Sequence, residues 1–205
     1  MRLLLTGLIL ALALPASAAT RESRRSVSAN GAFRVQLFVD APGECRLEVR
    51  TDRDVQWTVR ECVGDTSDAY FVSQDGERVW VLYTLPLKAD GKPRYAGRGR
   101  LRREVAPGWA TTRVAVLYDR EGKVLKAHRL SDFLKDGGYR KVRFLSQRFT
   151  WLEGVNGVPG KGPRLERDGT LAFETVDGVT HGLQLDAPPR TQRNSKTSAQ
   201  QNAQQ

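Results

Sequence analysis

Two thiols are the first residues of this 205-residue chain whose type and spacing could do chemistry. Cys45 and Cys62 are its only cysteines. A structural zinc site needs more soft ligands, and a thioredoxin-like redox pair needs a Cys-x-x-Cys spacing, so neither chemistry fits this pair. An even pair most simply forms one disulfide if the chain reaches an oxidising compartment.

The segments around the two cysteines predict how such a bridge forms. Residues 45–50 and 55–60 alternate apolar and polar side chains, as strands with one buried face do, and residues 51–54 are polar turn material. The register that matches the apolar faces pairs Val49 with Trp57, Leu47 with Val59 and Cys45 with Glu61. Cys62 is then one residue away from the position opposite Cys45. A bulge, or an exit of the chain from the ladder before Cys62, would bring the two sulfurs together.

Two histidines, His128 and His181, are the candidates for a general base. His181 lies opposite Glu174 if the turn at Asp177-Gly178 has two residues, and such a pair is usually a surface contact. The sequence positions no nucleophile beside either ring, so we favour the surface contact over catalysis.

Motifs of the common enzyme classes do not occur. The sequence has no nucleophile elbow, His-Glu-x-x-His, phosphate-binding loop or dinucleotide fingerprint, and the glycines over 154–162 lack the Lys-Ser/Thr pair of a phosphate loop. Two carboxylates for glycoside cleavage could come from any of the 23 acidic residues. We therefore predict no catalytic residue, no metal site and no cofactor.

The tryptophans could form a stacking platform for a sugar. Trp57 and Trp80 lie in apolar strand patterns, which favours the core. Trp109 and Trp151 flank Gly-rich segments and are the better candidates for an exposed platform, although most tryptophans are buried.

The first 18 residues have the pattern of a secretory signal. Arg2 precedes an apolar run over 3–14, and Ala16-Ser17-Ala18 supplies the small residues of a cleavage site. As a helix the run would reach only ~18 Å, which is short of the ~30 Å of a membrane core. The chain has no Asn-x-Ser/Thr sequon, and bacterial export to the periplasm or the medium therefore fits best.

Basic side chains concentrate in one stretch of the sequence. Residues 88–103 hold seven Lys or Arg residues against the single acid Asp90. A solvated loop is the plain interpretation, because unpaired charge runs usually face solvent. The functional alternative is an anion-binding loop with the candidate residues Lys92, Arg94, Arg98, Arg100, Arg102 and Arg103.

Export limits the partners of such a loop. Arg with Gly and an aromatic residue would suit RNA in the cytosol, but an exported protein meets little nucleic acid. Anionic envelope polymers, lipid head groups or an acidic protein are the partners that we expect.

Strand patterns dominate the remaining sequence. The run 78–85 is apolar on both faces and predicts a central strand. Ser131 and Gly137-Gly138 predict one short helix near 131–136, and Asp177-Gly178 predicts a final hairpin with a type I′ turn. We expect a mainly β fold, a single antiparallel domain built as a meander, a sandwich or small propeller-like repeats.

The composition changes along the chain and divides it into four parts. We expect a signal peptide over 1–18, a flexible basic arm over 19–29, a β-rich domain over 30–187 and a disordered Gln/Asn-rich tail over 188–205. Formal net charge is +10, from 33 basic and 23 acidic residues. Without Arg2 and the three basic residues of the tail, 29 basic residues face the 23 acidic ones, so the folded part is closer to balance.

One turn-and-strand element recurs along the chain. Residues 28–35 are similar to residues 73–80, and residues 119–124 and 166–171 repeat the turn-Gly-strand half. The starts lie 45, 46 and 47 residues apart, a spacing that suits four-stranded units. The element resembles the Ser-x-Asp-Gly turns of secreted β-propellers of the TolB type, and this resemblance implies blade-like repeats but no function.

We expect an exported, non-catalytic β-rich protein that binds or scaffolds something at the cell envelope. The alternative is an exported hydrolase acting on envelope polysaccharide or peptide, which would need a pocket with two acids, or a histidine with a positioned serine or aspartate. A subunit whose edge strands pair with a partner is a third class.

Overall fold

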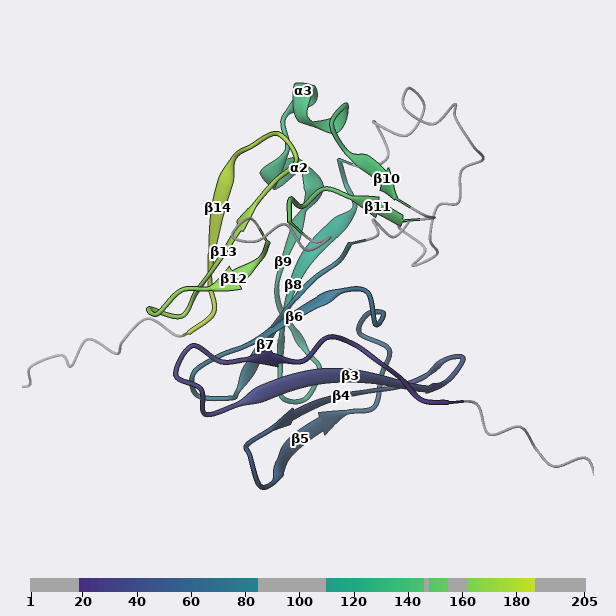
Figure 1. Ribbon diagram of the computed structural model, residues 1–205, viewed down its shortest axis with the longest axis vertical. Coiled ribbons are helices and arrows are strands. Elements are labelled where there is room, and N and C mark those ends of the chain that lie inside the picture. Colours follow the sequence, from purple (N-terminus) through teal and green to yellow (C-terminus); the bar gives the residue numbers. More distant parts are fainter. Residues whose placement is uncertain (1–18, 85–109, 146–147, 155–161, 187–205) are drawn as a thin grey trace, which may run out of the picture.

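The computed structural model describes residues 19–84, 110–145, 148–154 and 162–186. It is mainly β with antiparallel sheets, which confirms the predicted fold class (Figure 1).

The first sheet contains β1 (Arg21–Glu22), β2 (Ser26–Val27), β3 (Arg34–Ala41), β4 (Glu44–Arg50) and β5 (Val55–Val59). The second contains β6 (Ala69–Val72), β7 (Arg78–Leu82), β8 (Arg113–Asp119) and β9 (Val124–Arg129). The third contains β12 (Arg164–Leu165), β13 (Thr170–Glu174) and β14 (Thr180–Gln184), and β10 (Arg143–Leu145) pairs with β11 (Arg148–Thr150).

The second sheet is the middle layer of the fold because both of its faces are buried. In β7, Val79 and Val81 pack with the side chains of the first sheet. Trp80 and Leu82 point to the opposite face and pack with the third sheet and with Phe133. None of these four β7 side chains is exposed, and burial of each contributes about 1.5–3 kcal/mol. The prediction of a central strand is confirmed.

Two buried tryptophans tie the middle sheet to the C-terminal part of the chain. The indole N–H of Trp80 donates to the carbonyl of Gln184 at 2.9 Å. That of Trp151 donates to the carbonyl of Tyr83 at 2.7 Å. Both indoles thus satisfy their polar atom while their rings fill the core, which is the usual condition for burying tryptophan.

The cysteine hairpin forms with the predicted register over its central pairs, whereas the predicted pair of Cys45 with Glu61 is not part of the ladder. Leu47 lies opposite Val59, and Val49 lies opposite Trp57. Strand β5 ends at Val59, so the chain leaves the ladder before the second cysteine. Cys45 and Cys62 form a disulfide with their Cα atoms 4.9 Å apart. The predicted bridge is therefore confirmed, and it is compatible with export to an oxidising compartment.

The N-terminal segment is part of the first sheet, so the prediction of a flexible arm over 19–29 is wrong. Strands β1 and β2 both pair with one edge of β3. Ser23 is buried, and its hydroxyl accepts the N–H of Leu37 at 2.9 Å while its own N–H donates to the carbonyl of Leu37 at 2.8 Å. Strands of two residues show no periodicity, which is why the sequence pattern does not reveal them.

Five tight turns share one backbone arrangement. In each turn a glycine has a φ between 74° and 88°, a conformation that glycine adopts without steric cost. The glycine N–H donates to the carbonyl three residues earlier, in the pairs Gly31 to Ser28, Gly76 to Ser73, Gly122 to Asp119, Gly169 to Glu166 and Gly178 to Thr175. The first four are the recurring turns of the sequence. Many antiparallel folds contain such turns, so the resemblance to propeller repeats stays a prediction.

The final hairpin forms where it is predicted, but its turn and register differ. The N–H of Thr175 donates to the carbonyl of Val179 at 2.9 Å, which leaves three residues in the loop with Gly178 at the bulge position. This is a type I turn with a bulge, and not the predicted type I′ turn. His181 consequently lies opposite Phe173, so the predicted pairing of His181 with Glu174 does not form.

Two short helices, α2 (Leu130–Phe133) and α3 (Asp136–Tyr139), stand where one helix is predicted near 131–136. The predicted cap, Ser131, lies inside α2, and the N–H of the preceding Arg129 donates to Asp132 Oδ2 at 2.9 Å. Gly137 and Gly138, the predicted stop, lie inside α3. Helices this short depend on core packing, which α2 obtains by burying its first and last residues.

No helix in the described part of the chain is long and apolar enough to cross a membrane. The predicted signal peptide over 1–18 and the predicted tail over 188–205 lie outside the described residues.

Replacing both cysteines by serine should lower the free energy of unfolding by about 3 kcal/mol, because the bridge restricts the unfolded chain over a separation of 17 residues. Urea denaturation measures the loss. A reducing agent should produce the same loss in the wild type and none in the double variant. A stabilising bridge is contradicted if the denaturation midpoint of the double variant and that of the reduced wild type both equal the midpoint of the oxidised wild type.

Gly169→Ala should destabilise the protein more than Gly178→Ala, although both glycines have a positive φ. A Cβ at Gly169 would overlap with Asp186 Oδ2, whereas a Cβ at Gly178 meets nothing within 4 Å among the described residues. The displaced Asp186 would lose its bonds to the backbone N–H and side-chain amide of Gln74. We expect an excess loss of about 1–2 kcal/mol in urea denaturation, and equal losses would contradict this packing.

Candidate functional site

A cavity opens where edge strands of the three sheets converge. Its volume is about 570 Å³, which is in the usual range of small-ligand sites. Its walls come from the segments 24–29, 66–71 and 162–165, with Gly154 beside them. These segments include β2, β6 and β12, each of which pairs with only one strand in the described part of the chain.

Three arginines lie in the lining of the cavity. Arg24 is exposed, and its guanidinium has no hydrogen-bond or ion-pair partner among the described residues. The Nε atom of Arg25 lies 3.5 Å from Gln36 Oε1. Arg164 forms an ion pair with Glu166 at 3.0 Å, with both side chains about half exposed, so solvent weakens this pair.

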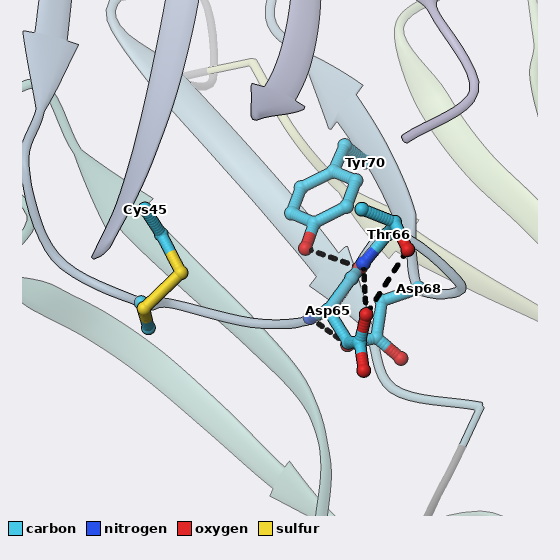
Figure 2. Close-up of a disulfide and its surroundings, with 6 residues drawn as sticks. Cys45, Asp65, Thr66, Asp68 and Tyr70 are labelled. Carbon is cyan, nitrogen blue, oxygen red and sulfur yellow. Dashed lines mark hydrogen bonds between the residues drawn. A yellow bond between two sulfur atoms is a disulfide. The ribbon is translucent and has the colours of Figure 1, made fainter. Parts of the chain in front are cut away.

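Asp68 is the acidic residue of the lining and is almost completely buried. Its Oδ1 atom accepts the N–H of Thr84 at 2.9 Å and the hydroxyl of Thr84 at 3.2 Å. Its Oδ2 atom accepts the N–H of Asp65 at 2.8 Å. Figure 2 shows Asp68 beside Asp65 and Tyr70, in the loop that follows the disulfide. The carboxyl therefore holds the loop 65–68 to the end of β7.

Burial raises the pKa of Asp68 to about 6, against the lowering effect of the N–H groups of Asp65 and Thr84. Tyr70, whose hydroxyl donates to the carbonyl of Asp65 at 2.9 Å, has its pKa raised mainly by burial. Both oxygens of Asp68 are already engaged, so this carboxyl has a structural task, whatever its protonation.

Ser67 presents an unused polar atom next to this carboxyl. Its Oγ atom is buried and has no hydrogen-bond partner among the described residues. Buried hydroxyls normally have a partner, and Ser67 belongs to the lining, so its hydroxyl is a polar atom that the described fold leaves unused next to the cavity.

The cavity can bind a ligand more readily than it can cleave one. General acid–base catalysis of hydrolysis commonly needs two carboxyls or a histidine with a nucleophile. Within the described residues the lining contains one carboxyl, Asp68, and no histidine. What the lining supplies instead is hydrogen-bond donors, from the arginines and from hydroxyl groups.

The two histidines lie away from this cavity, on either side of Phe133. The ring of His128 is 5.3 Å from that of Phe133, and the ring of His181 is 5.2 Å from it. His128 Nδ1 contacts Asp132 Oδ2 at 3.3 Å, while its buried Nε2 has no hydrogen-bond partner in the described part of the chain. Burial lowers the pKa of His181. His128 is mostly buried, with 19% of its side chain exposed.

The tryptophans do not form a sugar platform in the described residues. Trp151, a predicted exposed candidate, is 1% exposed, so this prediction is wrong. It packs against Phe133 and Phe173. Trp80 is buried as predicted, and Trp57 is partly buried with its indole N–H bonded to the carbonyl of Gly76 at 2.6 Å. Trp109 lies outside the described residues.

The predicted anion-binding residues lie outside the described residues, since Lys92, Arg94, Arg98, Arg100, Arg102 and Arg103 all fall within 85–109. The cavity itself is not predicted from the sequence. In the sequence, Arg24 and Arg25 belong to the basic arm that is expected over 19–29. No sequence motif includes Ser67, Asp68 or Arg164. Three segments far apart in the chain form the site, so no local spacing could reveal it.

Comparisons with protein-family models, curated proteins and solved structures found no match.

The pKa of Asp68 predicts a pH-dependent stability. A carboxyl whose pKa is higher in the folded than in the unfolded state binds its proton more readily when folded, so its contribution is largest at low pH and falls as pH rises through about 4 to 6. The stability difference between wild type and Asp68→Asn should change by about 2 kcal/mol between pH 4 and pH 7, in favour of wild type at pH 4.

Urea denaturation of both proteins across this range measures the difference, in which shared groups such as His181 cancel. The burial of Asp68 is contradicted if the difference is the same at every pH.

Proposed function

We propose that the protein is an exported, non-catalytic binding protein of the bacterial envelope and that it holds its partner in the cavity between the three sheets. The observation that carries this proposal is the cavity itself, with its three arginines and its hydroxyl groups. The confirmed disulfide supports an oxidising compartment such as the periplasm or the medium.

The chemistry of the lining favours an anionic partner over a neutral sugar. A neutral sugar is commonly held by an exposed aromatic ring, but Tyr70 and Phe71, the aromatic residues of the lining in the described chain, are almost fully buried. Arginine binds carboxylates and phosphates through paired N–H groups. An anionic envelope polymer, a lipid head group or an acidic protein remains the class of partner that we propose.

The alternative function, hydrolysis of envelope polysaccharide or peptide, has less support. Its one candidate acid in the lining is Asp68, whose pKa of about 6 would suit a general acid. Both of its oxygens, however, accept hydrogen bonds from the loop and from Thr84. A second carboxyl or a positioned nucleophile is lacking in the described lining.

Cosedimentation with bacterial envelope fractions tests the binding function. The protein beginning at Ala19 should sediment with the envelope, and Ala29→Trp, which places a large side chain in the lining, should reduce the bound fraction at least about tenfold. Gln56→Trp is the matched control, because Gln56 is exposed on β5 and is not part of the lining.

Equal retention of the two tryptophan variants would exclude the cavity as the binding site. Release of soluble fragments from the envelope by wild type, abolished in Asp68→Asn, would establish the hydrolase in place of the binding protein.

A further inference from the structure

The balance of hydrogen-bond donors and acceptors in the cavity selects its ligand. Arg24, Arg25 and Arg164 carry three positive charges and only donate hydrogen bonds. The acceptors of Asp68, the one carboxyl of the described lining, are occupied by Asp65 and Thr84. A ligand would therefore meet an excess of donors and of positive charge, and it has to supply acceptor oxygens.

Ser67 adds a fourth donor that the fold itself does not use. Its hydroxyl is buried without a partner among the described residues, and it reaches a group that enters the cavity only after a change of its χ1 rotamer. A hydroxyl beside guanidinium groups is a common arrangement for oxyanions, because each oxygen can accept from more than one donor. Ser26 belongs to the same lining, whereas the lining hydroxyls of Ser28, Thr66 and Tyr70 already donate to other residues of the protein.

We propose that this cavity is a phosphate-binding site that takes a phosphomonoester or pyrophosphate group through Arg24, Arg25, Arg164 and Ser67. A phosphomonoester has three acceptor oxygens and about −1.5 to −2 charges, so it can accept from three guanidinium groups at once, whereas a single carboxylate has two oxygens. Asp68 and Glu166, the ion-pair partner of Arg164, offset part of the positive charge of the arginines. This inference rests on the proposed binding function and specifies its ligand chemistry.

Pyrophosphate is the soluble probe, and isothermal titration calorimetry measures its affinity. The triple variant Arg24→Gln/Arg25→Gln/Arg164→Gln should weaken binding at least about tenfold, since a hydrogen bond to a charged group contributes about 1.5–3 kcal/mol. Ser67→Ala should weaken binding about threefold to tenfold, and because its hydroxyl has no partner among the described residues, the unfolding midpoint should not fall.

A charge-matched control separates this site from general attraction to a basic protein. Arg53, Arg60 and Arg140 are exposed and lie outside the lining. Their triple replacement by glutamine removes the same charge and should change the affinity for pyrophosphate less than about twofold. Equal losses of affinity for pyrophosphate in the two triple variants would overturn the proposal. The proposal would also be overturned if the wild type neither bound pyrophosphate nor was retained by the vesicles described next.

Vesicles distinguish the two sources of the phosphate group. Retention on phosphatidylcholine vesicles that contain phosphatidic acid, displaced by pyrophosphate, would identify a lipid head group. Binding of pyrophosphate without vesicle retention would identify a soluble phosphorylated ligand. Envelope binding that Ala29→Trp abolishes, while pyrophosphate neither binds nor competes, would leave the binding function in place and overturn the phosphate site alone.

Discussion

The fold depends on a single strand that belongs to two cores. Successive residues of β7 point to opposite faces, and all of them from Val79 to Leu82 are apolar and fully buried. A strand with this pattern is stable only when another layer covers each face. The first sheet covers one side, and the third sheet with α2 covers the other. The three-layer arrangement is thus a consequence of four consecutive apolar residues.

The cavity follows from the same arrangement. When three antiparallel sheets stack through their faces, their edge strands lie together at one side of the stack, where no further strand pairs with them. Strands β2, β6 and β12 are such edges, and their neighbouring segments bring the arginines to a common opening. The hydrogen bonds of Asp68 to Asp65 and Thr84 fix one wall of this opening. The proposed binding function therefore depends on the edges of the sheets and not on the core.

How much the sequence predicts depends on whether the signal is local. The cysteine hairpin is predictable because the period of two residues fixes its register once the apolar faces are matched. The central position of β7 is predictable because its residues are apolar on both faces, so that a further layer has to cover each face. The final hairpin shows where this fails: the Asp-Gly pair locates the turn, but three loop residues in place of two move His181 from Glu174 to Phe173. Short elements such as β2 and α3 carry too few residues for any periodicity.

The candidate site could not be predicted because its residues have no common motif. Arg24 and Arg164 are 140 positions apart in the chain, and only the stacking of the sheets places both in one lining. The engaged state of Asp68 and the unused hydroxyl of Ser67 are also properties of the folded chain, since each depends on distances between loops. The resemblance of the turns to propeller repeats stays a prediction, although the recurring turns do share one hydrogen-bond arrangement.

Amide chemical shifts in an NMR titration with pyrophosphate test the central claim most directly, because they report each segment of the cavity separately. The account predicts saturable shifts in all three walls together, at residues 24–28, 66–69 and 164–165, with one dissociation constant. Shifts confined to one of these segments, or concentrated elsewhere on the protein, would contradict a binding site formed by the three sheets.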